Sequence, residues 1–187
     1  MAILAGDGLL NMAYETMLEA PFTQENPAEA VKAMREIACR AGVRGMVAGQ
    51  TLDVKLEGKE PSMESVRYIH LHKTADLLTA PVVAGLMLAG ASEDQLNAAR
   101  AYGRGLGLAF QIEDDLLDLE GDVAALGKET GMDAQRGKMT WPAVRGVENA
   151  RLDACKAVEE AVEAMAIFGQ RGEKLSKLAQ ESLVRKM

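Results

Sequence analysis

The segment that decides the fold reads Phe110-Gln111-Ile112-Glu113-Asp114-Asp115-Leu116-Leu117-Asp118-Leu119. Within it, polar residues recur at i, i+3, i+4 and i+7, the spacing that places side chains on one face of an α-helix. This face, called the acidic stripe below, consists of Gln111, Asp114, Asp115 and Asp118. Ile112 and Leu119 border it on one side and Leu117 on the other, so the sequence predicts a helix with carboxylates among apolar neighbours.

Three carboxylates on one helix face repel one another and are costly to desolvate unless cations neutralise them. Hard divalent cations prefer oxygen ligands, and Mg²⁺ is typically held by one or two carboxylates together with substrate phosphates. A solvated acidic face is the simpler interpretation, but such a face would not lie among so many leucines. We therefore expect Asp114, Asp115 and Asp118 to bind Mg²⁺.

The remainder of the chain shows helical spacing and almost no alternation, which predicts an all-α protein. The 187 residues fit one domain over 1–187, since a domain has about 150 residues. We expect helices over 1–19, from Pro27 into the low fifties with Asn26 as its N-cap, from Ser62 to about Ala80 with a bend or break at Pro81, and from Ser92 to 120. Residues 121–138 read mostly as loop, and shorter helices are expected at about 140–148, 151–168 and 172–186.

The charge of the chain argues against two classes of partner. The formal net charge is −7, which is unfavourable for binding nucleic acid or an anionic membrane surface. The longest uncharged stretch, residues 77–92, is too short and too broken by proline and glycine to span a bilayer. Residues 1–20 lack the basic start of a signal peptide, and two cysteines suit a reducing compartment. These features predict a cytoplasmic protein.

A second candidate group surrounds Lys73. Lys73 shares a helix face with Val66, Ile69 and Leu77, and a lysine is rarely buried unless it is paired. A snorkelling lysine near a helix end explains this as well as a functional one does. Thr74 follows, and the expected break at Pro81 would let it face a cavity.

A third group is the Gly-rich segment that holds Gly127-Lys128 and Gly137-Lys138. Glycines with interspersed lysines suit phosphate oxygens. The segment is not a Walker A loop, because Glu129 stands where Ser or Thr is needed. A merely solvated loop fits this segment equally well.

Taken together, these residues resemble the trans-isoprenyl diphosphate synthase family, and within it the bacterial farnesyl and geranylgeranyl diphosphate synthases. The resemblance covers essentially the whole chain. It rests on Gly6-Asp7 with Leu9-Leu10, Gly49-Gln50 with Asp53, His70 with Lys73-Thr74, Phe110-Gln111 with Asp114-Asp115-Leu116-Leu117-Asp118, Gly127-Lys128 with Gly131 and Asp133, and Lys138-Thr140-Pro142.

The resemblance implies the isoprenoid-synthase helical bundle and a prenyltransferase that uses Mg²⁺. An allylic diphosphate would ionise to a cation, which isopentenyl diphosphate would then attack. Lys73, Thr74 and Gln111 carry over as catalytic residues, with Thr74 and Gln111 stabilising the cation. The substrate-binding residues that carry over are Lys73, Thr74, Gln111, Lys128, Lys138, Gln50 and Asp53.

The chain departs from the family pattern in one respect. The family has two aspartate-rich motifs, whereas Asp114-Asp115 is the only Asp-Asp pair in this sequence. The chain therefore resembles the C-terminal portion of such an enzyme, and we expect it to be inactive alone. The resemblance implies a homodimer, and removing the other part would expose an apolar face, which favours association.

Two alternative functions stay open. A non-catalytic remnant or partner subunit would bind other helices through the exposed face. A terpene cyclase-like enzyme on the same fold also uses helix-borne aspartates, but such enzymes do not usually carry the lysine-threonine and glycine-lysine pairs.

Overall fold

The computed structural model describes residues 1–120 and 137–184, and these residues form helices without any strand. This confirms the all-α prediction, with Lys128 and most of the expected loop outside the described residues. The elements, in chain order, are α1 (Ala2–Glu19), α2 (Pro21–Glu25), α3 (Pro27–Ala41), α4 (Met46–Leu56), α5 (Met63–Ile69), the π-helical turn η1 (His70–Ala75), α6 (Asp76–Leu88), α7 (Glu93–Glu120), α10 (Trp141–Arg145), α11 (Val147–Ala164), the 3₁₀ segment η2 (Met165–Gly172), α12 (Glu173–Glu181) and η3 (Ser182–Val184).

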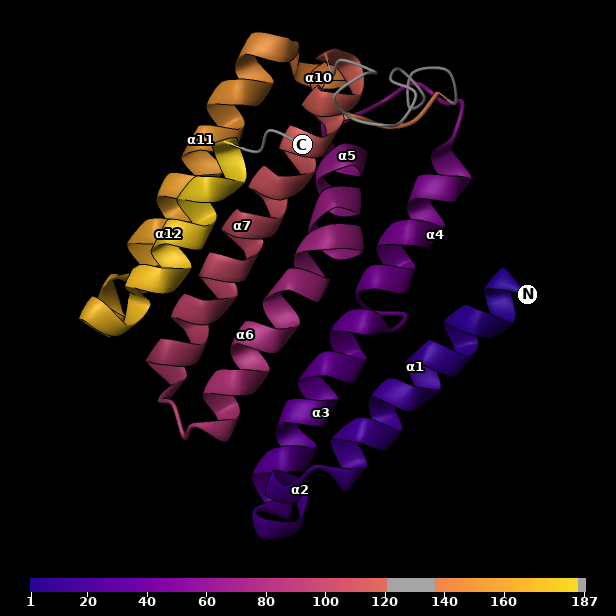
Figure 1. Cartoon of the computed structure of the whole chain (residues 1–187). Coiled ribbons are helices and arrows are strands. Elements are labelled where there is room, and N and C mark those ends of the chain that lie inside the picture. The colour runs from indigo at the N-terminus through magenta and orange to yellow at the C-terminus, as the bar shows by residue number, and fades with distance from the viewer. Residues whose placement is uncertain (121–136, 185–187) are drawn as a thin grey trace.

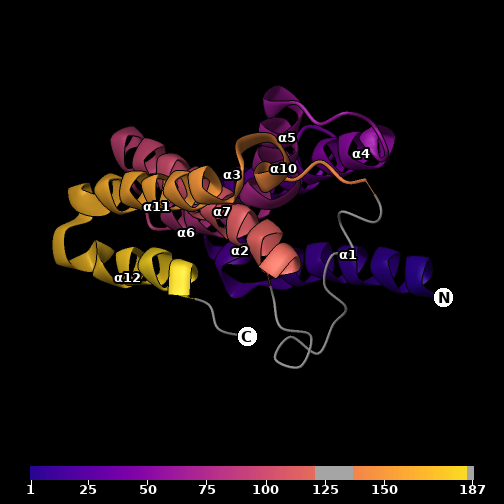
Figure 2. The ribbon, with the colours of Figure 1, turned by 90° about the horizontal axis from the view of Figure 1, so that it is seen from above.

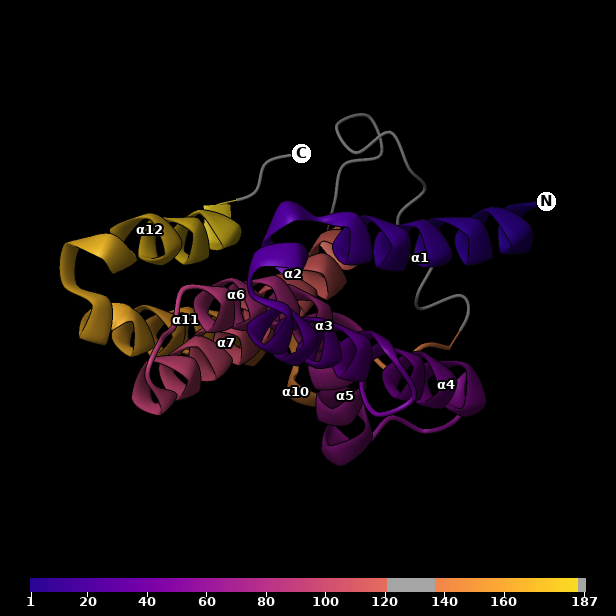
Figure 3. The same ribbon diagram turned by 90° about the horizontal axis from the view of Figure 1, so that it is seen from below.

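The long helix α7 lies at the centre of the bundle. It packs against α11 on one side and against η1 and α6 on the other, and α3 packs on α6 in turn (Figure 1). Figures 2 and 3 show that α1 and α12 lie on the same side of the layer formed by α3, α6, α7 and α11. No described helix is long and apolar enough to cross a membrane.

Two apolar clusters follow α7 along its length. One, near the acidic stripe, joins Ile112 and Leu116 to Val66 and Trp141. The other, nearer the start of α7, surrounds the fully buried Tyr102. Burial raises the pKa of Tyr102 to about 12, and its hydroxyl donates to the Leu175 carbonyl at 2.8 Å. The two clusters hold the buried face of α7 along its length.

Local capping signals gave correct helix starts. The Ser62 hydroxyl accepts from the Ser65 N–H at 3.2 Å. Ser92 and Gln95 form the reciprocal bonds of a capping box, at 2.9 and 3.3 Å. Asn26 precedes α3 as predicted, with Pro27 as its first residue, but the Asn26 side chain makes no capping bond.

Two interruptions differ from the predictions. The helix expected from Pro27 into the low fifties is broken between Ala41 and Met46, where a Cβ at Gly45 would overlap the backbone of Arg40. The helix does not break at Pro81, since α6 continues through it to Leu88. Proline has no N–H, so the Leu77 carbonyl loses one helical hydrogen bond while the rest of α6 is retained.

The C-terminal helix boundaries were also predicted imprecisely. The helices expected at 140–148 and 151–168 are instead the short α10 and the long α11, separated by Gly146 with a φ of 76°. A second glycine with positive φ, Gly169 at 53°, lies inside η2 before α12. Glycine adopts this backbone region at little cost, which explains both reversals of direction.

Candidate active site

The candidate site forms where η1 and α10 meet the C-terminal half of α7, with α4 packed against η1. The π-helical turn η1 supplies three of its side chains, His70, Lys73 and Thr74. Two glycines let this turn approach its neighbours, because a Cβ at Gly49 would overlap the Lys73 backbone and one at Gly107 would overlap Ala75. The turn is thus held between α4 and α7, and π-helical turns are frequent at functional sites.

Lys73 is paired rather than merely snorkelling. Its Nζ lies 2.5 Å from Oδ2 of Asp53, which is buried on α4 with a relative exposure of 6%. The ion pair orients the ammonium group and compensates the buried carboxylate. The structure therefore brings together two of the predicted substrate-binding residues that are twenty positions apart in sequence.

Thr74 and Gln111 form the second link between η1 and α7. The Thr74 hydroxyl donates to Oε1 of Gln111 at 2.5 Å. The Gln111 amide nitrogen then donates to Asp115 Oδ1 at 3.3 Å and lies 3.4 Å from Asp114 Oδ2. Gln111 thereby connects the lysine-threonine pair to the acidic stripe through one side chain.

The two adjacent aspartates have different surroundings. Asp114 is exposed, whereas Asp115 is 3% exposed. Oδ2 of Asp115 accepts from the Trp141 backbone N–H at 2.7 Å and lies 3.2 Å from His70 Nε2. Both oxygens of Asp115 thus have protein partners, so binding of a metal ion by Asp115 would compete with these contacts.

His70 belongs to the same buried group. Its ring stacks on Trp141 with centroids 5.5 Å apart, and its Nδ1 is buried without a hydrogen-bond partner in the described part of the chain. The sequence placed His70 beside Lys73 but not among the site residues. Its contact with Asp115 joins η1 to α7, which periodicity along one helix could not reveal.

A second set of polar contacts joins α10 to α11 next to the site. Asp153 of α11 accepts from Trp141 Nε1 at 2.8 Å and from Arg145 Nε at 2.8 Å. The hydrogen bond from Arg145, with a smaller contribution from Trp141, holds the pKa of Asp153 below its usual value, against the opposing effect of burial. These bonds hold the turn that presents the Trp141 N–H to Asp115.

The remaining predicted residues have different positions. Asp118 is half-buried further along the stripe, and Lys138 is half-buried shortly before α10. Gln50 is exposed on α4, and no hydrogen bond joins its side chain to the other candidates in the described ranges. Within residues 1–120 and 137–184, no three His, Cys, Asp or Glu side chains group closely enough to hold a metal ion.

Comparison with known proteins places this arrangement in a family. The profile of the polyprenyl synthetases matches residues 1–180. The chain belongs to the polyprenyl synthetase family. The resemblance stated from the motifs is confirmed, as is the isoprenoid-synthase fold.

Similar proteins include geranylgeranyl pyrophosphate synthase 11 of Arabidopsis thaliana, 40% identical over 90% of this chain and 48% of the relative. Farnesyl diphosphate synthase of Escherichia coli is 39% identical over 86% of this chain and 54% of the relative. The chain thus spans about half the length of these curated relatives.

Solved structures give the same fold. The geranylgeranyl pyrophosphate synthetase of Pyrococcus horikoshii superposes with a TM-score of 0.87 at 26% identity, over 98% of this chain and 67% of that one. The geranyltransferase of Helicobacter pylori, solved with magnesium and isoprenyl diphosphate, gives 0.81 at 27% identity, over 98% and 59%.

Proposed function

We propose that the residues around the second half of α7 take part in transferring a prenyl group from an allylic diphosphate to isopentenyl diphosphate. The observation that carries the proposal is the continuous polar connection from Thr74 through Gln111 to Asp114 and Asp115. Lys73, which is paired with Asp53 of α4, lies on the same turn as Thr74. A cation, a hydroxyl and an acidic stripe together suit a diphosphate ester that must ionise.

The donor set of the stripe fits Mg²⁺. Mg²⁺ prefers one or two carboxylates and takes its other ligands from water and phosphate oxygens. Asp114 is exposed and Asp118 half-buried at i and i+4 of α7, so we assign these two as the ligands. When bound, Mg²⁺ would neutralise the charge that develops on the leaving diphosphate.

Asp115 has a different proposed role in this arrangement. Its contacts with the Trp141 N–H and His70 would keep it within the protein, where it positions Gln111 and the end of α7. We therefore propose Asp115 as a positioning residue rather than a direct ligand.

Each remaining side chain has a defined task. Lys73, oriented by Asp53, would bind diphosphate oxygens, as would Lys138 and, outside the described residues, Lys128. The exposed Gln50 would contact substrate from α4. The Thr74 and Gln111 oxygens would lie beside the carbon that becomes positive, and such preoriented dipoles stabilise developing charge strongly.

The proposed reaction breaks one bond and forms another. The allylic C1–O bond breaks, and its electron pair leaves with diphosphate. The double bond of isopentenyl diphosphate then attacks C1 and forms the new carbon–carbon bond. The resulting cation loses a proton, for which the released diphosphate is the nearest base, and a longer allylic diphosphate remains.

A hybrid enzyme tests this proposal. In the E. coli farnesyl diphosphate synthase, the matched region would be replaced by this chain. We expect the hybrid to extend geranyl diphosphate with labelled isopentenyl diphosphate, and Asp114→Ala to reduce turnover at least ~100-fold. The chain by itself should form no product, because one acidic stripe holds only part of the neutralising charge.

The same experiment separates the competing functions. A hybrid that folds, as judged by its circular dichroism, yet makes no product in the presence of Mg²⁺ would contradict catalysis and favour a partner-subunit role. Release of a diphosphate-free hydrocarbon would favour a cyclase. Unchanged turnover in Asp114→Ala would exclude the stripe from the reaction.

We further propose that the chain forms a cytoplasmic homodimer through α1. None of the residues of α1 is buried, although many of them are large and apolar. The exposed apolar side chains are Ile3, Leu4, Leu9, Leu10, Met12 and Leu18. Its large apolar side chains lie around the helix rather than on one face, as in helices that are covered by partners.

Light scattering tests this dimer. The unsubstituted chain should give the mass of two chains, and the double variant Leu10→Glu with Leu18→Glu should give half of that mass. A monomeric unsubstituted chain would contradict the proposal.

A further inference from the structure

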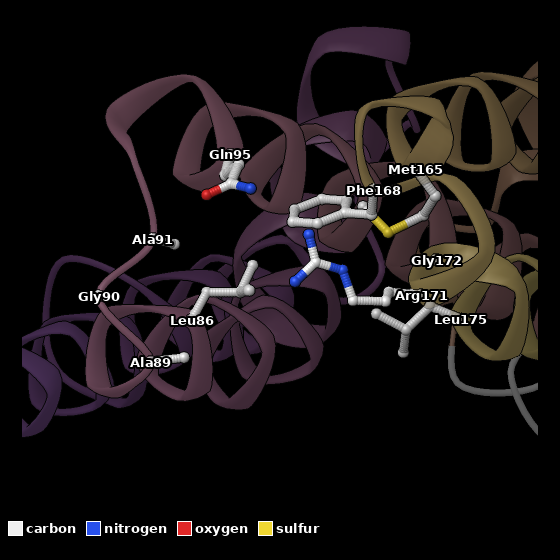
Figure 4. A pocket seen from close by; sticks show the side chains of 10 residues that line it. All are labelled: Leu86, Ala89, Gly90, Ala91, Gln95, Met165, Phe168, Arg171, Gly172 and Leu175. Atoms are coloured by element: carbon white, nitrogen blue, oxygen red, sulfur yellow. The ribbon is translucent and has the colours of Figure 1, made fainter.

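A cavity lies at the end of the bundle remote from the acidic stripe. It opens between the loop that joins α6 to α7 and the segment η2–α12, and its volume is about 230 Å³ (Figures 1 and 4). Gly90 with a φ of 71° and Gly169 with a φ of 53° lie in these two segments and turn the chain sharply. The proposed transfer chemistry uses none of these residues.

Most of the cavity wall is apolar. Leu86 comes from α6, Met165 and Phe168 from η2, and Leu175 from α12. Figure 4 shows the ring of Phe168 and the side chain of Leu86 on opposite sides of the opening. Such a wall accommodates a hydrocarbon tail, because binding removes apolar surface of both partners from water.

The two polar side chains in the wall, Arg171 and Gln95, both present hydrogen-bond donors. The oxygen of Gln95 accepts from the Ser92 N–H, which leaves its amide nitrogen available, and in Figure 4 this nitrogen is on the side of Phe168. The guanidinium group of Arg171 points toward the same opening. In the described part of the chain no carboxylate pairs with Arg171, and none of the residues in the lining is acidic.

We propose that this cavity binds a small organic anion, with a carboxylate or phosphate head on Arg171 and Gln95 and a short apolar tail against Phe168 and Met165. Within the described residues neither donor group is occupied by a protein acceptor, so both are available to a ligand that accepts hydrogen bonds, and arginine binds both carboxylate and phosphate in a fork. A volume of 230 Å³ is roughly eight times the ~30 Å³ of one liquid water. The ligand therefore has roughly a dozen non-hydrogen atoms or fewer.

Calorimetric titration of the chain in magnesium-free buffer tests the ligand class, since the acidic stripe then has no metal through which to bind an anion. Hexanoate and hexyl phosphate share a tail and differ in the head, whereas hexanol lacks the charge and inorganic phosphate lacks the tail. We expect one or both of the first two to bind with a dissociation constant on the order of 1 mM or tighter, and the last two at least tenfold more weakly. Whichever head binds more tightly identifies the source of the anion.

Three variants locate the binding. Arg171→Ala should weaken the bound probe at least tenfold, and the side chain is exposed, so its loss leaves the core intact. Gln95→Glu keeps an oxygen for the Ser92 N–H but replaces the donor by a carboxylate, so it should also weaken the probe tenfold. Arg35→Ala, an exposed arginine of α3 outside the lining, is the matched charge control and should change nothing.

Several results would overturn the proposal. These are binding of hexanol or inorganic phosphate as tightly as the six-carbon anions, no binding of either anion at 10 mM or below, and unchanged binding in Arg171→Ala and Gln95→Glu. An equal loss in Arg35→Ala would show that net charge, rather than the cavity, attracts the anion.

Discussion

The helices α7 and α1 differ in what surrounds them rather than in their tendency to form. On α7, Tyr102, Ile112 and Leu116 are buried, and glycines allow neighbouring backbones to approach closely. On α1 no residue is buried, and a Cβ added at Gly6 or Gly8 would meet no atom within 4 Å. The candidate site lies on α7, where contacts from η1 and α10 fix Gln111 and Asp115. The apolar helix α1 has no such neighbours to fix the positions of its side chains.

The largest expected effect is a difference in the free energy of unfolding between variants of two adjacent aspartates of α7. Asp115→Ala leaves the buried Trp141 N–H and His70 without their acceptor, so the free energy of unfolding should fall by roughly 3 kcal/mol. Asp114→Ala, at an exposed position, should change it by less than about 0.5 kcal/mol. Urea unfolding of both variants measures this difference.

For binding of Mg²⁺ with a diphosphate, we expect the larger effect from Asp114 rather than from Asp115. With Mg²⁺ and a non-hydrolysable allylic diphosphate analogue, Asp114→Ala should lose most of the binding heat once binding by the unsubstituted chain is established. Equal stability losses in the two variants would show that the inward contacts of Asp115 contribute little.

The second effect concerns ligand stabilisation of the α7 region. Mg²⁺ with a diphosphate analogue at 100 times its dissociation constant should add about 2.7 kcal/mol to stability, and hence roughly 5–10 °C to Tm for a chain of this size. Ca²⁺ should act less strongly, since Mg²⁺ requires tight octahedral geometry. A scanning calorimetry trace indifferent to Mg²⁺ and analogue, or an undiminished shift in Asp114→Ala, would argue against a formed site.

The third effect compares glycines on the two helices. A Cβ at Gly107 would overlap Ala75, so Gly107→Ala should destabilise the chain by roughly 2 kcal/mol through overpacking. Gly8→Ala meets open space on α1 and should stabilise by about 0.5–1 kcal/mol, because alanine is the better helix former. Thermal unfolding of the pair measures both signs. Because α1 is the proposed dimer contact, a destabilising Gly8→Ala would mean that the partner chain packs directly against this position of α1.

The sequence alone predicted the features that depend on neighbouring residues. The spacing of Gln111, Asp114 and Asp118 placed them on one helix, and the Ser92–Gln95 capping box fixed the start of that helix. The family and its fold followed from the order of the motifs along the chain.

Features that depend on contacts between helices were not predictable from local pattern. The pairing of Lys73 with Asp53 requires α4 to meet η1, and the inward position of Asp115 requires α7, η1 and α10 to meet. The π-helical turn packs closely on α4 and α7 at Gly49 and Gly107. Spacing along one helix assigns a face, but it cannot distinguish the exposed Asp114 from the buried Asp115.

The smallest expected effect lies at the contact between α10 and α11 and depends on pH. The bond from Arg145 depresses the folded-state pKa of Asp153 below the usual value of 3.8. Its contribution to stability is therefore present above pH 3.8 and is lost as the pH falls through the folded-state pKa. Because Arg145 is well exposed, solvent screening keeps this contribution small.

Asp153→Asn isolates that contribution, because the amide oxygen can still accept from Trp141 Nε1 while the charge is removed. We expect Tm to fall by roughly 1–3 °C at pH 6–7, and the difference from the unsubstituted chain to shrink progressively as the pH falls below 3.8. Asp7→Asn, on the exposed helix α1, is the matched control and should show no such pH-dependent difference. If the Asp153→Asn difference persists undiminished at pH 3, then the carboxylate charge is not what secures α10 beside Asp115, and the Trp141 bond to Asp153 must carry that role.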